Sequence, residues 1–197
     1  MVEFALVLPM LLILLLGIVD FGRVFAAGIT IEAAARDGAE AVALERLHNP
    51  PTTPGDPTYY QRLHDLAART ICHDARLLSN TTYSAGPPEA CPGMPVVAVC
   101  VHDDHDPLCS APDAVTGHTG SVPPSCAQIL DTTSRDNTSG HEPVSNFVEV
   151  RVCYQFTTLF NLHFQLPMNT GLNLGDVWLE RTRTFVIDCP PQGVATC

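Results

Sequence analysis

The chain has 197 residues, with ten Arg, no Lys, a formal net charge of −11 and a sequence pI near 4.9. This length accommodates one domain with an anchor, or two small domains. Because nucleic-acid binding depends on clustered Lys and Arg, the acidic balance argues against phosphate backbones as partners.

The first predicted element is a helix that begins with an uncharged apolar stretch, residues 4–19. As a helix this stretch is about 24 Å long, and extending it to Phe25 gives the roughly 30 Å of a bilayer core. Asp20 and Arg23 are three residues apart on one helix face. They are therefore expected to pair, which lowers the cost of both charges near a membrane.

The same helix is predicted to continue without a break as an alanine-rich, amphipathic segment, residues 26–47. Glu32, Arg36 and Glu40 are spaced four residues apart and are expected to form ion pairs along the helix. The apolar face is predicted from residues that recur at roughly helical spacing: Ile31, Ala35, Val42 and Leu47. The helix should end at His48, because the sequence Asn-Pro-Pro follows.

A proline-rich linker, residues 50–57, separates this helix from a second one predicted over residues 58–78. Its apolar residues share one face: Tyr59, Leu63, Leu66, Ala67, Ile71, Cys72, Ala75 and Leu78. The position of Cys72 on this face favours a disulfide to the sheet.

Three β-strands are predicted beyond the second helix, at residues 96–101, 147–158 and 176–189. The first is a short β-branched run typical of a buried strand, and the other two alternate residue by residue between two faces. Between them, residues 103–145 are rich in Asp, Pro, Thr, Ser and Gly and predict a long irregular excursion. Residues 159–174 predict a turn-rich link.

These elements predict an α+β fold. A long N-terminal helix occupies residues 1–48, and a small head with the second helix and a short antiparallel sheet occupies residues 49–197. The apolar run that continues directly into an amphipathic segment suggests a helix that begins in a membrane and ends in an assembly, and we expect the head to lie outside the cell.

Eight cysteines lie after residue 71. Their even number predicts disulfides formed in an oxidising compartment, with a pairing that the sequence leaves open. Cys109 and Cys126 are expected to pin the irregular excursion, and Cys189 with Cys197 would close the tail. Without any CxxC pair, structural zinc is disfavoured. The predicted disulfide residues are Cys72, Cys91, Cys100, Cys109, Cys126, Cys153, Cys189 and Cys197.

Two strings resemble a known family. MVEFALVLP at residues 1–9, followed by a leucine-rich run and GIVDFGR at residues 17–23, resembles the TadE-like family, pilin-like proteins of tight-adherence pili in the type IV pilus superfamily. VEVRVCYQFTTLF at residues 148–160 is similar to a strand that such proteins carry.

The resemblance implies synthesis with a short basic leader, cleavage by a prepilin peptidase, and packing of apolar helices into a filament core. No basic leader precedes Glu3, so we expect that processing has removed it or that the numbering begins at an internal Met. The implied partners are other copies of the chain in a helical filament, the inner membrane before assembly, the pilus assembly machinery and the prepilin peptidase. The residues expected to act in assembly are Glu3, Phe4, Pro9, Gly17, Asp20 and Arg23.

Glu3 is the residue with the most specific predicted role in assembly. In a filament its carboxylate would pair with the amino terminus of a neighbouring subunit and set the axial register, because an unpaired buried charge is costly. The simpler interpretation is a solvated acid at a helix N-terminus, stabilised by the helix dipole. The apolar run directly after Glu3 favours the first. A cleaved signal peptide is disfavoured because no basic residue precedes the run, and a plain anchor gives no reason for the acid.

Two weaker motifs are a candidate metal-binding cluster and two glycosylation sequons. The densest polar cluster could hold Ca²⁺ or a transition metal: His102, Asp103, Asp104, His105 and Asp106. The EF-hand spacing is absent and a solvated loop is the simpler interpretation, so no metal and no cofactor is predicted. Asn80 and Asn137 fit the glycosylation sequon, which arises often by chance on a Thr- and Ser-rich surface.

Catalysis is not predicted. The sequence has no GxSxG, HExxH, phosphate-loop or GxGxxG motif, and six further histidines are scattered: His48, His64, His73, His118, His141 and His163. The predicted function is that of a structural, pilin-like subunit that polymerises through its N-terminal helix into an extracellular filament. We also expect the filament to act in cell adhesion and the chain to be a glycoprotein. The alternatives are a minor pilin and a monomeric single-pass membrane protein whose head binds a ligand or partner.

Overall fold

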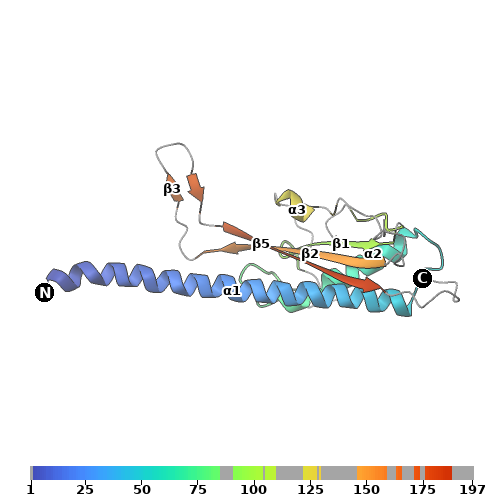
Figure 1. The fold of residues 1–197 in the computed structure, drawn as a ribbon, viewed down its shortest axis with the longest axis horizontal. Helices are drawn as coiled ribbons and strands as arrows, with labels where there is room; N and C mark the ends of the chain where they lie inside the picture. The colour runs from blue at the N-terminus through green and yellow to red at the C-terminus, as the bar shows by residue number, and fades with distance from the viewer. Residues whose placement is uncertain are drawn as a thin grey trace, which may run out of the picture.

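The computed structural model describes residues 2–84, 91–103, 105–109, 122–127, 129, 146–158, 163–165, 171–173 and 176–187. Two helices lie against one face of a three-stranded antiparallel sheet, and the first half of the long helix projects from this head, with the N-terminus at its free end (Figure 1). The predicted α+β class, with its disulfide-stapled head, is confirmed.

The long helix α1 runs from Val2 to His48, as predicted, and includes Pro9 within its apolar part. Its 47 residues span about 70 Å at 1.5 Å per residue. The last helical bond runs from the amide of Asn49 to the carbonyl of Glu45, over 2.8 Å. Proline at the next position cannot donate a further bond, so the helix ends there.

Helix α2, Pro57–Ala75, begins at a conventional cap, with the Asp56 carboxylate accepting from the amide of Thr58 over 2.9 Å. It packs along α1. A β-carbon on Gly38 of α1 would lie 2.8 Å from the side chain of Ile71, so this glycine permits the close approach. The helix ends before the predicted Leu78, because the Tyr154 hydroxyl binds the backbone of Asn80 and draws the chain toward the sheet.

The sheet contains the three predicted strands, β1 (Val96–His102), β2 (Asn146–Thr157) and β5 (Asp176–Ile187). Their order is β1-β2-β5 and both pairs are antiparallel, so β2 is the central strand.

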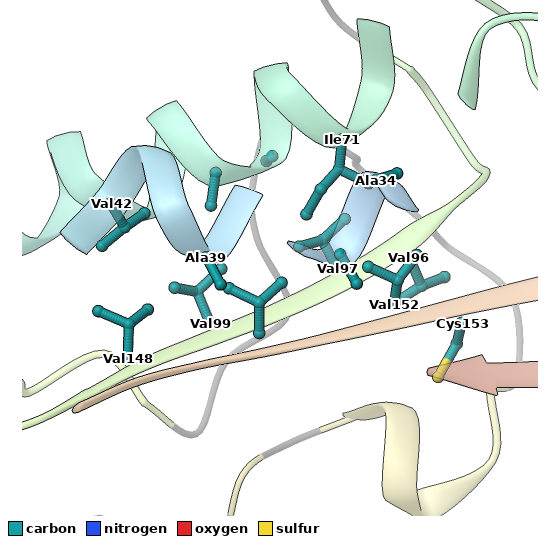
Figure 2. Close-up of a cluster of buried hydrophobic side chains, with 14 of the residues drawn as sticks. Ala34, Ala39, Val42, Ile71, Val96, Val97, Val99, Val148, Val152 and Cys153 are labelled. Carbon is teal, nitrogen blue, oxygen red and sulfur yellow. The ribbon is translucent and has the colours of Figure 1, made fainter. Parts of the chain in front are cut away.

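The core lies between the helices and this sheet (Figure 2). Residues that pair across neighbouring strands point to the same face of the sheet. Val150 on β2 faces the helices together with its two partners, Val99 on β1 and Arg183 on β5. Ile31, Ala35 and Val42 of α1 are fully buried against it, as predicted. Leu47 was predicted on this face but is 45% exposed, because the buried side chain at the end of α1 is Arg46, which pairs with Asp103 in the core.

Three disulfides join described cysteines: Cys72–Cys91, Cys100–Cys109 and Cys126–Cys153. The last two tie the predicted excursion to β1 and β2, as expected for Cys109 and Cys126. The expected bridge from Cys72 to the sheet was wrong, since its partner Cys91 precedes β1. Cys189 and Cys197 lie outside the described residues.

Two predicted irregular regions contain regular structure. A short helix, α3 (Pro124–Ala127), lies within the excursion, where the Cys126–Cys153 bridge fixes it to β2. The predicted link between β2 and β5 contains a two-stranded antiparallel ribbon, β3 (His163–Gln165) and β4 (Gly171–Asn173). These two short strands lie within the predicted turn-rich link and were not predicted from the sequence.

Candidate assembly surface

The N-terminal half of α1 presents apolar side chains on all its sides. Every side chain described from Val7 to Val19 is exposed, with Met10 at 77% and Ile13 at 71%. By length and composition α1 is a candidate membrane span, and its most apolar window is not buried at all in the monomer. A helix that is apolar all round needs lipid or other helices around it.

The apolar half of α1 ends where the helix enters the head, at Asp20 and Arg23; this part of the helix is called the neck. There Arg23 donates to the carboxylate of Asp20 over 3.2 Å, so the predicted pair forms. The Arg23 guanidinium also lies 5.3 Å from the ring centroid of Phe156 on β2, a cation–π contact. Asp20 is 9% exposed. The pair is thus neutralised and fixed to the head at the base of the apolar segment.

The predicted helical ion pairs of Glu32 with Arg36, and of Arg36 with Glu40, do not form. Instead the Glu32 carboxylate contacts the guanidinium groups of Arg181, at 3.6 Å, and Arg183. Both arginines lie on the β5 face that α1 crosses, so a salt bridge across elements replaces the local one. Each pair is half exposed and contributes at most about 1 kcal/mol. Together they orient the edge strand on α1.

A buried polar network joins the far end of α1 to α2 and the end of β1. One carboxylate oxygen of Asp103 accepts from Arg46 and from the Tyr60 hydroxyl, each over 2.7 Å. Burial, and next the hydrogen bond to this carboxylate, raise the pKa of Tyr60 above its ordinary value. The backbone amide of His105 donates to the other Asp103 oxygen, at 3.1 Å. Sequence reasoning missed this network, since its two charged partners lie 57 positions apart.

The candidate metal residues at 102–106 turn toward different partners. His64 binds Asp106 over 2.9 Å, His102 binds Glu149 over 3.1 Å, and Asp103 belongs to the network above. The hydrogen bond from His102, together with Arg151, holds the pKa of Glu149 below its ordinary value against the opposing effect of burial. Asp104 lies outside the described residues. The described members of the cluster therefore serve as structural partners of four elements rather than as one ligand set.

Two other groupings within the described residues have metal-like spacing: Cys100, Asp106 and Cys109, and Cys126, Cys153 and Glu180. In both, the two cysteine sulfurs are joined in a disulfide. A disulfide lacks the thiolate that binds a metal. Neither grouping therefore has the donors of a metal centre.

The sequon residue Asn80 has a structural role. Its side-chain amide donates to the Gln155 carbonyl over 2.7 Å and to the Thr157 hydroxyl over 3.0 Å. A glycan on this nitrogen would take the place of one of its two hydrogens, so at least one of these bonds, which fasten the segment after α2 to β2, would be lost. The other sequon residue, Asn137, lies outside the described residues.

The other predicted assembly residues lie in the apolar half of α1. Val2–His48 is helical throughout, but the side chains of Glu3 and Phe4 fall outside the described part. A β-carbon added to Gly17 would have nothing within 4 Å, so the monomer supplies no packing reason for glycine there. The assembly roles of all six residues stay predictions.

The long N-terminal helix is apolar in its free half and embedded in a disulfide-stapled α+β head in its second half, an arrangement that fits the pilin-like class expected from the sequence. Residues 1–40 match the family model described as TadE-like protein, so the resemblance found in the sequence is confirmed for this segment. The chain matches no curated protein and no solved structure. The TadE-like match and the candidate membrane span together fit a membrane-anchored component related to Tad pili.

Proposed function

We propose that this chain is a structural subunit that polymerises through α1 into an extracellular, Tad-like pilus filament after a membrane-inserted stage. The observation that carries the proposal is the fully exposed apolar half of α1, directly followed by a helix half that is locked in a compact head. The match of residues 1–40 to the TadE-like family supports it.

The driving force would be burial of the same apolar surface in two successive environments. In the bilayer the lipid tails cover it, and after extraction only neighbouring α1 helices can do so. Burying a thousand Å² of apolar surface contributes on the order of 25 kcal/mol before ordering costs. The disulfides of the head suit this location, because they limit unfolding outside the cell.

Glu3 would set the stagger between subunits by pairing with the amino terminus of a neighbour. Other copies of the chain, the inner membrane, the assembly machinery and a prepilin peptidase are the proposed partners. The pairing of Asp20 with Arg23 leaves the apolar segment free of unpaired charge at its base, which favours both insertion and helix packing.

Electron microscopy of purified material from cells that express Glu3→Ala or Asp37→Ala tests the proposal. Asp37 is an exposed acid on the head half of α1, so its replacement removes the same charge outside the apolar segment. We expect filaments built of this chain from the wild type and from Asp37→Ala, and none from Glu3→Ala, with the head folded in all three. Monodisperse detergent-bound monomers of the wild type would contradict the proposal, as would normal filaments of Glu3→Ala for the role of that residue.

A further inference from the structure

Helix α1 keeps an apolar outer surface after it has entered the head. From Phe21 to Ala33, every residue of α1 that is exposed is either apolar or glycine. Phe25 is 64% exposed and Ile29 is 56% exposed. A helix packed on a head normally has charged and polar residues on its outward face. The outer stripe, which consists of Phe25, Ala26, Ile29 and Ala33, therefore continues the apolar surface of the free half onto the head.

Lipid tails do not reach the whole of this stripe. If Glu3 marks one surface of the bilayer, a hydrocarbon core of about 30 Å ends near residue 24. The paired charges of Asp20 and Arg23 lie close to that level. Ile29 then lies about 8 Å beyond the hydrocarbon core, and Ala33 about 14 Å beyond it. The far end of the outer stripe is therefore left for protein to cover.

Charged residues mark where the stripe ends. Arg36 and Asp37 are exposed on α1 within one turn of Ala33. An apolar partner would have to bury their charges without compensation if it extended over them. Such a partner therefore covers about two and a half turns of α1 on the head, from the neck to Ala33.

A groove lies along each side of the outer stripe. On the α2 side, a groove of about 320 Å³ is lined by Ala26 and by Leu77, which is 88% exposed. On the β5 side, a groove of about 520 Å³ is lined by Ile29, Ala33 and Arg183. Helices pack by placing the side-chain ridges of one into the grooves beside the ridges of the other. The stripe thus has a relief, as well as an apolar character, that suits a second helix.

We propose that the outer stripe binds the free half of α1 from a second copy of this chain, displaced along the filament axis. That half, from Val7 to Val19, is helical, uncharged and exposed on all sides. A parallel copy covers residues 25–33 with these side chains when it is displaced by about 14–18 residues, or roughly 21–27 Å. Ile29 then lies beside roughly residues 11–15 of that copy.

The inference deepens the proposed function and rests on it. Two copies inserted in one bilayer are level with each other, so their outer stripes can meet only without displacement. The displaced contact forms once one copy has moved out of the bilayer. Covering the stripe then buries apolar surface that stays in water during the membrane-inserted stage, which favours assembly.

Photo-crosslinking in filaments of the full-length chain tests the inference. One variant carries benzoylphenylalanine in place of Ile29, and the matched control carries it in place of Leu44, which is 45% exposed on α1 beyond the charged residues. Trypsin cuts α1 after Arg23 and after Arg36. Mass spectrometry therefore shows which part of a second copy is joined to the probe.

We expect the Ile29 probe to join its own peptide, residues 24–36, to the peptide that ends at Arg23, and the Leu44 probe to give no such product. Two joined copies of peptide 24–36 would mean that the copies are not displaced and would overturn the inference. An Ile29 probe that joins no second copy would overturn it too, as would a Leu44 probe that joins the peptide ending at Arg23 equally well.

A pair of charge variants gives a second measurement, in case the bulky probe itself blocks assembly. Ile29→Asp should lose filaments while the urea midpoint of its head stays that of the wild type, whereas Leu44→Asp should keep filaments. Normal filaments of Ile29→Asp would contradict the inference. Electron microscopy of the wild type separates the two levels: absence of filaments contradicts the proposed function itself, whereas wild-type filaments without the displaced crosslink contradict only this inference.

Discussion

Replacing Asp103 with Ala should destabilise the head more than the loss of any exposed charge. The carboxylate is 5% exposed and holds Arg46, which is 6% exposed, and Tyr60, both over 2.7 Å. Its removal leaves the Arg46 guanidinium buried without a counter-charge. Breaking a buried pair in this way costs about 3–5 kcal/mol. The matched control is Asp65→Ala, whose partner Arg69 lies 3.9 Å away on the exposed face of α2 and whose loss should cost less than about 1 kcal/mol.

The assay is urea unfolding of the oxidised full-length chain in detergent micelles, followed by Trp178 fluorescence. With a slope of about 2 kcal/mol per molar urea, the loss at Asp103 lowers the midpoint by roughly 1.5–2.5 M. The double variant Arg46→Met with Asp103→Leu removes both charges and should recover most of the loss. A midpoint for Asp103→Ala as high as that of Asp65→Ala would refute the reasoning, as would a double variant no more stable than the single one.

Three further predictions use the same unfolding assay. Gly38→Ala places a methyl group 2.8 Å from Ile71 and should cost about 1–3 kcal/mol of folding stability. Adding Ile71→Val should restore part of this loss. A Gly38→Ala variant as stable as the wild type would contradict close packing of α1 on α2 at this position. Because the folded pKa of Glu149 lies below its ordinary value of 4.5, its ionised form stabilises the head above that value, and this contribution is lost as the pH falls through the folded pKa. Glu149→Gln should therefore reduce the fall in the free energy of unfolding as the pH is lowered. An unchanged fall would contradict the stabilising effect of the hydrogen bond between His102 and Glu149. Replacing Cys126 and Cys153 by Ser opens a bridge between residues 27 apart and should cost about 3 kcal/mol, more than the same change at Cys100 and Cys109, which are nine residues apart.

The sequence predicted those features that depend on a local period. Alternation placed Val148, Val150 and Val152 on the helix-side face of β2, and the bilayer-length apolar run identified the free half of α1. Partners far apart in the chain could not be predicted in this way. Glu32 has an arginine at helical spacing, yet its carboxylate reaches two arginines about 150 positions away, because β5 crosses α1 at that point.

Position in the sequence was also a poor guide to the cluster at residues 102–106. Five polar residues in succession suggest a ligand set, but a chain leaving a strand sends successive side chains in different directions. His102 therefore meets Glu149 on β2, whereas Asp103 enters the core toward α1 and Asp106 meets His64 of α2. The cluster is dense because several elements converge at this corner, and each element needs its own polar partner.

The same logic explains why the two halves of α1 have different roles. In the head half, small side chains such as Ala34, Ala39 and Ala43 let α2 and the sheet approach closely, so this face of the helix is already filled. In the free half, leucines and isoleucines stand on every side, a pattern that one packed face could not satisfy. A partner for α1, whether lipid or another helix, therefore has most to gain between Val7 and Phe25. The neck of the head, with Arg23 against Phe156, is the boundary at which a lipid partner must end.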